Sequence, residues 1–444
     1  MRRAGAAARV AVFAAMGLAV TVTVTVTAEA DAAGFAIREQ SAAFQGLSFA
    51  GVAAGGADIS TMYFNPATLA LHDGHQASFS LSYIAPKAEF ELEEATNGAG
   101  TPIRGSAGGD IAENAFLPAI YGMAAFGDWR FGLGLTAPFG LVTDQPDDWV
   151  GRYHATDSEL ATINVNPAVT YRVSDRLAIG AGLVLQYADA TLARAIDFGS
   201  LNPAGTPTAN DGSVEIEGDD IDFGFTLGLL AEPRDGTRIG LGYRSQINHS
   251  LSGDADFDTG GPIGEALAGP LFTDTGGRAS LSTPQIASLG VRQRVHADVD
   301  ILATVEWTGW STFDELVVQF DNPAQPASTT REDWNDSWFV ALGAEWRPVE
   351  ELTLQVGTAF DQSPIEDSLR TPRIPGNDRY WFSLGTTWSP RPWVDVTAAY
   401  SHIRVEDGDV DLVDTPTPLG GRGTLRGTFD NRVDILTVGG VIRF

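Results

Sequence analysis

The chain has 444 residues, no cysteine and a formal net charge of −29. This composition excludes disulfides and thiolate metal sites. It also argues against nucleic acid as a partner, because phosphate binding requires basic patches. Beyond the N-terminus no apolar run reaches about 18 residues, which argues against ordinary transmembrane helices.

The N-terminus has the pattern of a secretory signal peptide. Three arginines near the N-terminus precede an apolar stretch over residues 10–26, and small residues surround Ala30 and Ala32. We assign residues 1–32 to this signal and expect the mature chain to be exported. An uncleaved membrane anchor is the alternative, but threonines interrupt the apolar stretch, which is short for a spanning helix.

Residues 33–73 lack sustained alternation but are rich in apolar side chains, which would be costly to leave in water. From residue 74 to the C-terminus, apolar and polar residues alternate with a period of two. In residues 221–229, every odd position is apolar and the even positions are Asp, Gly, Thr and Gly. This pattern predicts about fourteen strands, near residues 75–91, 114–127, 129–137, 158–173, 176–195, 214–232, 236–252, 279–293, 297–308, 335–347, 351–361, 378–389, 392–405 and 429–444.

The connections alternate between short and long. Residues 127–128, 174–175 and 390–391 are tight turns, whereas the intervening connections are long and rich in Gly, Pro, Asp and Thr. This order is typical of an outer-membrane β-barrel with periplasmic turns at one rim and extracellular loops at the other. A soluble β-sandwich, the alternative, has no reason to sort its loops in this way.

The predicted fold is therefore an all-β, transmembrane, antiparallel barrel of about 14 strands spanning residues 74–444. Such a barrel has a lumen too wide for its wall side chains to fill. We expect residues 33–73 to occupy that lumen as a hatch, or plug. Its apolar residues are candidates either for ligand contact or for packing of the hatch itself: Phe35, Ile37, Phe44, Phe49, Met62 and Phe64.

Several motifs resemble the long-chain fatty acid transporter family, the FadL-type outer-membrane porins, which include importers of aromatic hydrocarbons. The most specific is the Asn65-Pro66-Ala67 triplet, which follows an Asp-x-Ser-Thr motif within residues 33–73. The resemblance extends over the mature chain, through residues 34–41, 50–53, 58–67, 149–153, 164–168, 306–311 and 374–381.

This resemblance implies passive transport. A hydrophobic ligand would be captured at an extracellular groove, pass to an internal site, and leave sideways into the membrane after the hatch rearranges. Exit in the family is at a kink in the third strand, where this chain has Gly132 and Gly134. Asn65, Pro66 and Ala67 are expected to hold the hatch against the wall. If the ligand is a carboxylate, Arg194 is the first candidate for its head group and Arg152 the second.

The sequence thus predicts a channel of the Gram-negative outer membrane for hydrophobic compounds, with long-chain fatty acids first and aromatic or alkane hydrocarbons as the alternative. A general polar porin and an outer-membrane lipase are alternatives of other classes. No catalytic motif, cofactor motif or metal-ligand spacing is found, so we expect no enzyme, cofactor or metal. Expected partners are the hydrophobic molecule, lipopolysaccharide and outer-membrane lipid, and the barrel assembly machinery through the strand ending at Phe444. We expect a monomer.

Overall fold

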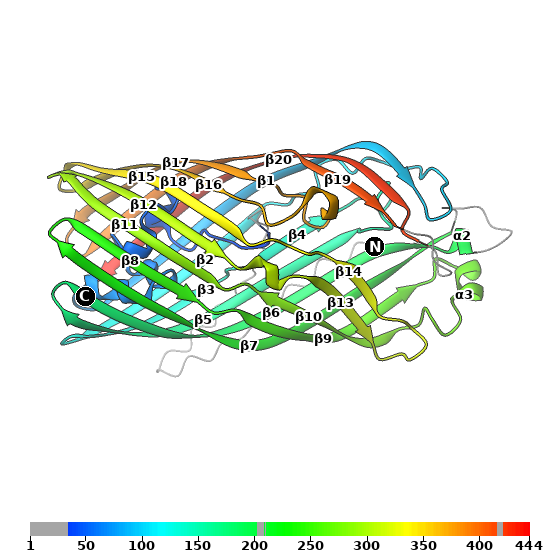
Figure 1. The fold of residues 1–444 in the computed structure, drawn as a ribbon, viewed down its shortest axis with the longest axis horizontal. Helices are drawn as coiled ribbons and strands as arrows, with labels where there is room; N and C mark the ends of the chain where they lie inside the picture. The colour runs from blue at the N-terminus through cyan, green and yellow to red at the C-terminus, as the bar shows by residue number, and fades with distance from the viewer. Residues whose placement is uncertain (1–33, 202–207, 209, 415–420) are drawn as a thin grey trace.

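The computed structural model describes residues 34–201, 208, 210–414 and 421–444. The expected signal peptide, residues 1–32, lies outside the described residues. The described chain forms one antiparallel β-sheet that closes into a barrel, as the alternation predicts (Figure 1). Closure occurs where β1 (Gln76–Thr96) pairs with β20 (Thr424–Arg443), from Gln76 opposite Arg443 to Thr96 opposite Thr424.

The barrel wall has 14 strands, which confirms the predicted number. Three of them are divided into two pieces by local breaks. In chain order the wall consists of β1, β2 (Ala115–Phe126), β3 (Trp129–Thr136) with β4 (Gly140–Asp144), β5 (Asp157–Ser174), β6 (Leu177–Asp197), β7 (Asp211–Arg234), β8 (Thr237–Arg244) with β9 (Ile247–Asp258), β10 (Thr275–Thr283) with β11 (Ile286–His296), β12 (Val299–Thr308), β15 (Ser337–Val349), β16 (Leu352–Asp361), β17 (Arg379–Arg391), β18 (Val394–Val405) and β20.

Two predicted strands, 236–252 and 279–293, were expected to be continuous and are not. The second breaks at Pro284, which has no amide hydrogen to donate to the ladder. The first breaks at Ser245, whose N–H and hydroxyl bond the backbone of Phe225 on the neighbouring strand. At Ser245 the hydroxyl therefore takes the place of a backbone acceptor, and at Pro284 pairing stops for lack of a donor.

The tight turns lie at one end of the barrel, the turn end, and the long connections lie at the other, the loop end (Figure 1). The long connections contain the short elements β13 (Glu315–Phe320), β14 (Ser328–Arg331), β19 (Gly408–Val413), α2 (Phe198–Leu201), α3 (Pro262–Ala268), η4 (Trp310–Thr312) and η5 (Asp367–Leu369). Sorting of the connections by length is therefore confirmed.

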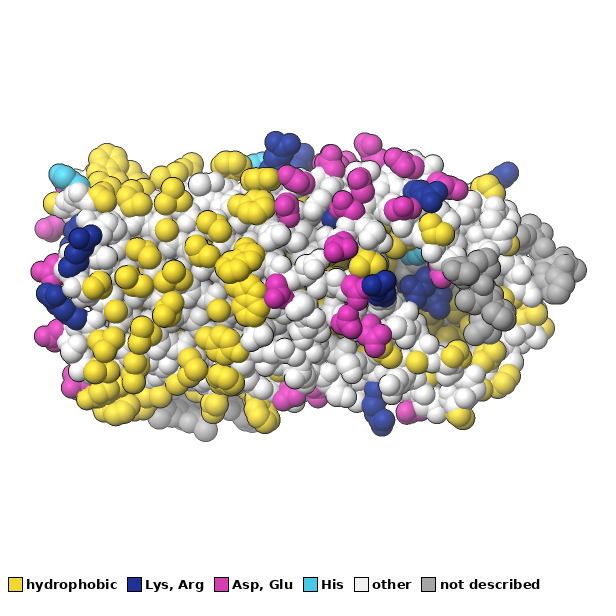
Figure 2. All heavy atoms as spheres, in the orientation of Figure 1, with side chains coloured by type: hydrophobic (Ala, Val, Ile, Leu, Met, Phe, Trp, Pro, Cys, Tyr) yellow, Lys and Arg dark blue, Asp and Glu magenta, His cyan; other side chains and the backbone are white. Residues whose placement is uncertain are grey.

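Apolar side chains face outward over the half of the barrel nearest the turn end. Phe223 is 74% exposed and Leu183 66%, while their neighbours along each strand point inward. Figure 2 shows the outward apolar side chains as a yellow band between a charged rim at the turn end and the acidic and basic side chains of the loop half. Such a band is what a wall in contact with hydrocarbon requires. Among the described residues, no helix is long and apolar enough to cross a membrane.

Residues 34–73, here called the hatch, lie inside the barrel as four short helical pieces (Figure 1). These are α1 (Ala42–Gln45), η1 (Val52–Ala54), η2 (Ile59–Tyr63) and η3 (Pro66–Leu71). The hatch approaches the wall closely at inward-facing glycines. A Cβ on Gly240 would lie 1.8 Å from the Ala53 carbonyl oxygen, and one on Gly242 2.0 Å from that of Phe64. These glycines are therefore required by space.

Candidate functional site

A cavity, here called the outer cavity, lies inside the barrel between the hatch and the loop end. The space free of protein atoms there is about 810 Å³, with the solvent at its opening included. Its lining is mostly apolar and comes from several wall strands, from the hatch and from the long connections, including Phe35, Leu141, Leu160, Leu251, Leu281 and Phe313. An apolar molecule is therefore favoured over water in this space.

Phe35 of the hatch forms one side of the outer cavity and sits among four other aromatic rings. Its ring centroid lies 4.7 Å from that of Trp310, 5.6 Å from those of Phe313 and Trp334, and 5.9 Å from that of Phe139. Three of these rings meet it edge to face, a favourable geometry for aromatic pairs. The start of the hatch is thus anchored through Phe35. Its partners are Phe139, between β3 and β4, and three rings of the connection after β12.

A half-buried arginine, Arg373, lines the outer cavity from the connection after β16. Its guanidinium donates to the carbonyl oxygens of His154, Asp157 and Ala193 and to the Ser158 hydroxyl, and to no carboxylate among the described residues. Burial, together with the nearby cations Arg422 and Arg194, lowers the pKa of Arg373 to about 9. The group stays protonated at neutral pH, so this wall of the cavity carries uncompensated positive charge.

Glu332 also lines the outer cavity and could neutralise part of this charge. The Trp334 indole N–H donates to its carboxylate at 3.2 Å. Burial raises the pKa of Glu332 to about 7, so a large share of the molecules carry it uncharged at neutral pH. The lining also includes Glu159, Glu217 and Arg278, so the positive charge is local to the Arg373 side of the cavity.

The third wall strand breaks beside the start of the hatch. β3 ends at Thr136 and β4 begins at Gly140. In the break, the Ile37 N–H donates to the Pro138 carbonyl at 2.7 Å, and the Gly140 N–H donates to the Phe35 carbonyl at 3.0 Å. In a regular ladder these backbone groups would form hydrogen bonds with β2. Here they form hydrogen bonds with the hatch.

As a result, the wall between β2 and the third strand lacks its ladder over one stretch. Pairing of β2 with β3 ends at Ile120 opposite Leu135 and resumes only at the single bridge between Ala112 and Thr143. On its other side the break remains attached, because the Phe139 backbone bonds Thr162 of β5. The interruption therefore has an open edge on the β2 side alone.

A second cavity, here called the inner chamber, lies on the turn side of the same hatch segment and encloses about 670 Å³. Ala36 and Ile37 line this chamber, whereas Phe35 lines the outer cavity. Pro138 of the strand-three break also lines the chamber, and so does Phe64. The segment Phe35–Ile37 is thus the partition between the outer cavity and a chamber that reaches the break.

The Asn65-Pro66-Ala67 triplet lies against β5, β6 and β7. The Asn65 amide donates to the carbonyls of Ala53 at 2.7 Å and Leu229 at 3.0 Å, and its side-chain oxygen accepts the Ala67 N–H at 2.9 Å. Pro66 begins η3, where its missing N–H is not needed, and its carbonyl accepts the Thr170 hydroxyl at 2.6 Å. This triplet joins two parts of the hatch to the wall.

The other predicted site residues lie in different surroundings. Phe44 and Phe49 are fully buried between the hatch and the wall, and Met62 packs against β2 and β3; none of the three lines either cavity. Gly132 leaves room for the hatch, since a Cβ there would lie 2.7 Å from Leu69. Gly134 sits under the Tyr121 ring, 3.2 Å from an added Cβ.

The two predicted head-group arginines differ in their partners. Arg152 pairs with Asp211 at 2.7 Å, so its charge is compensated. Arg194 lines a larger groove of about 1720 Å³ among the long connections, together with Arg422; we call it the loop groove. Sequence reasoning missed Arg373, Arg422 and Glu332 because they lie in connections with no alternation. For Arg422 the one available signal was a basic residue in the acidic connection over residues 406–428.

Comparisons with known proteins agree with this geometry. A model of the family described as outer membrane protein transport protein (OMPP1/FadL/TodX) matches residues 23–444. A long-chain fatty acid transport protein of Salmonella typhi is 29% identical over 400 residues, covering 85% of this chain and 89% of its own. Among solved structures, a FadL homologue of Pseudomonas aeruginosa superimposes with a TM-score of 0.85 at 24% identity, covering 93% of this chain and 100% of its own. A toluene transporter of Ralstonia pickettii does so with a TM-score of 0.63 at 17% identity, covering 90% and 98%. The chain therefore belongs to the OMPP1/FadL/TodX family of outer-membrane transport proteins of Gram-negative bacteria.

Proposed function

We propose that this protein takes up long-chain fatty acids across the outer membrane by passive transport. The observation that carries the proposal is the outer cavity itself: an apolar space with Arg373 at its wall, paired only with neutral oxygens. A fatty acid combines an apolar chain with one carboxylate, and both parts find a matching surface there. An arginine–carboxylate pair in such a site is stronger than one in water.

The route begins at the loop groove, where Arg194 and Arg422 attract the carboxylate. The ligand then enters the outer cavity and its chain displaces Phe35 from the surrounding rings. Release of the Phe35–Ile37 segment breaks its two backbone hydrogen bonds to the strand-three break and joins the outer cavity to the inner chamber. The molecule leaves sideways through the unpaired edge of β2.

Lateral release has a clear energetic advantage. Each methylene group moved from water to an apolar environment contributes about 0.8 kcal/mol, so returning a long acyl chain to water would be costly. A path from an apolar cavity into the bilayer avoids that step. The absence of ladder bonds between residues 113–119 and 136–142 provides the place at which the wall can part.

Binding by the purified protein tests the proposal. Oleate should bind saturably, and Arg373→Gln should weaken that binding by tenfold or more while leaving heat-modifiable barrel migration intact. Arg404→Gln is the matched control, because Arg404 is exposed on the outer face of β18. Saturable binding of toluene without binding of oleate would overturn the fatty-acid assignment.

Aromatic hydrocarbons are the second candidate, supported by the rings around Phe35. For them, toluene binding should be insensitive to Arg373→Gln. A polar porin or a lipase is less well supported, because the hatch fills the lumen and the relatives are named as transport proteins. Contacts with lipopolysaccharide and the barrel assembly machinery, a monomeric state, and division into signal (1–32), hatch (33–73) and barrel (74–444) stay predictions.

A further inference from the structure

A fourth cavity opens at the turn end of the barrel, on the side of the hatch away from the outer cavity. This periplasmic vestibule encloses about 1330 Å³, and the hatch residues Gly56 and Ala57 form part of its surface. The remaining lining comes from β8, β11, β15, β16, β17, β18 and β20 near their turns. It shares no lining residue with the three cavities assigned to the transport route.

The vestibule gathers arginine side chains in a chain that is otherwise strongly acidic. Its lining has four carboxylates, Glu345, Glu350, Glu351 and Asp395, against six arginines: Arg238, Arg292, Arg294, Arg347, Arg391 and Arg443. The whole protein has only 28 basic residues and a net charge of −29. Asp300 and Glu232 approach these arginines from outside the lining, so the vestibule gathers guanidinium groups without a net excess of positive charge.

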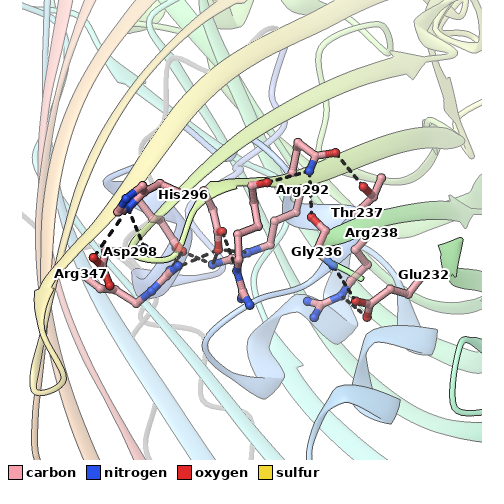
Figure 3. A network of polar contacts seen from close by, with 12 residues as sticks. Glu232, Gly236, Thr237, Arg238, Arg292, His296, Asp298 and Arg347 are labelled. Atoms are coloured by element: carbon pink, nitrogen blue, oxygen red, sulfur yellow. Dashed lines mark hydrogen bonds and ion pairs between the residues drawn. The ribbon is translucent and has the colours of Figure 1, made fainter. Parts of the chain in front are cut away.

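Three of these arginines share two carboxylates. Arg292 contacts both Asp300, at 2.7 Å, and Glu345. Arg347 lies 3.2 Å from Asp300 and 3.5 Å from Glu345, and Arg294 lies 3.3 Å from Asp300. Figure 3 shows Arg292 and Arg347 converging on this network from different strands. Three cations on two anions leave one positive charge without a counter-ion inside the cluster.

Donor groups are also left unused. Arg238 Nε and Arg347 Nη2 are both buried atoms with no hydrogen-bond partner among the described residues. The closest carboxylate to Arg238 is that of Glu232, at 4.0 Å, too long for a hydrogen bond. Arg391 makes no ion pair with any described residue. An unpaired buried donor is costly, and a guanidinium is best satisfied by the paired oxygens of a carboxylate or phosphate.

We propose that the periplasmic vestibule is a binding site for an oxyanion, either a phosphate or a carboxylate group, held by Arg238 and Arg347 with Arg391 at its mouth. The anion accepts the unused Arg238 and Arg347 donors once these side chains turn toward the vestibule. Because the vestibule lies beyond the hatch from the outer cavity, this site is separate from the proposed fatty-acid site and does not depend on it.

Isothermal titration of the full chain in nanodiscs of zwitterionic lipid, at low ionic strength, tests this. Inorganic phosphate should bind saturably, and Arg238→Gln/Arg347→Gln should weaken that binding at least tenfold. Arg391→Gln, which removes an exposed side chain, should weaken it less and leave folding unaffected. Arg176→Gln is the control, because Arg176 pairs with Asp235 at a turn and does not line the vestibule. Added salt should weaken the binding.

A second titration distinguishes the two sources of the oxyanion. Octanoate is titrated into Arg373→Gln, which lacks the proposed head-group cation of the outer cavity. Octanoate binding that is lost on adding Arg238→Gln/Arg347→Gln assigns a carboxylate to the vestibule, and phosphate binding alone assigns a free phosphate. No saturable binding of either, or equal binding by the double variant, overturns the proposal.

Discussion

Asn65 provides a quantitative test of how the hatch is held. Asn65→Ala removes three hydrogen bonds in a fully buried position, those to Ala53, Leu229 and Ala67. A typical bond contributes about 1 kcal/mol net, and a buried group left without a partner costs about 1–3 kcal/mol. Leu229 belongs to a continuous ladder, so the main losses fall on the two hatch groups. Together they amount to about 3 kcal/mol, or roughly a hundredfold in the equilibrium for local opening.

Amide hydrogen exchange measures this opening directly. In Asn65→Ala, the amides of η2 and η3 should exchange roughly a hundredfold faster, while the wall amides and heat-modifiable migration stay as in the wild type. Uptake should change as well. Asn248→Ala is the control, since Asn248 is exposed on the outer face of β9. If the hatch amides were as well protected in Asn65→Ala as in the wild type, the role assigned to the triplet would be refuted.

Gly240→Ala should loosen the hatch in the same exchange assay, because its Cβ would lie 1.8 Å from the Ala53 carbonyl oxygen; unchanged protection would contradict the steric reason for this glycine. Burial raises the pKa of Glu39 in the hatch from 4.5 to about 7, so its contribution to stability is fully present below about pH 4.5 and is lost as the pH rises through 7. The protection factor of the hatch amides, which corrects for base-catalysed intrinsic exchange, should therefore fall between about pH 5 and 8 in the wild type, and Glu39→Gln should remove that fall. Phe35→Ala should speed ligand uptake and weaken ligand retention, because it removes the ring between the outer cavity and its surrounding aromatic cluster. Deletion of residues 34–73 should raise ion leak in planar bilayers, and an unchanged conductance would contradict the plug.

The wall of the barrel could be predicted because its physics is local. In residues 221–229 the odd positions face hydrocarbon and the even positions face the lumen, so the pattern is visible within nine residues. Tight turns and long connections are also local features. The breaks at Ser245 and Pro284 were missed because a period of two continues across them; only the pairing partners show that the ladder stops.

The site was harder to predict because its parts are distant in the chain. Arg373 bonds the backbone oxygens of His154, Asp157 and Ala193, which no local pattern connects to it. Phe35 was a candidate for ligand contact, and it lines the outer cavity. Its neighbours in the sequence do not distinguish it from Phe44, which packs against the wall. Apolar character predicted the hatch as a whole, whereas the role of each residue depends on the wall opposite it.

The way the hatch is attached indicates which part of it can move. Its central portion lies directly against wall glycines, as at Gly240 and Gly357, so it packs closely on the wall. The Phe35–Ile37 segment is held instead by two backbone hydrogen bonds and by the rings around Phe35. Those contacts are worth about 1 kcal/mol each, and a ligand chain in the outer cavity can replace the ring contacts with its own. The ligand thus weakens the partition by occupying the space beside it, and transport then needs no displacement of the whole hatch.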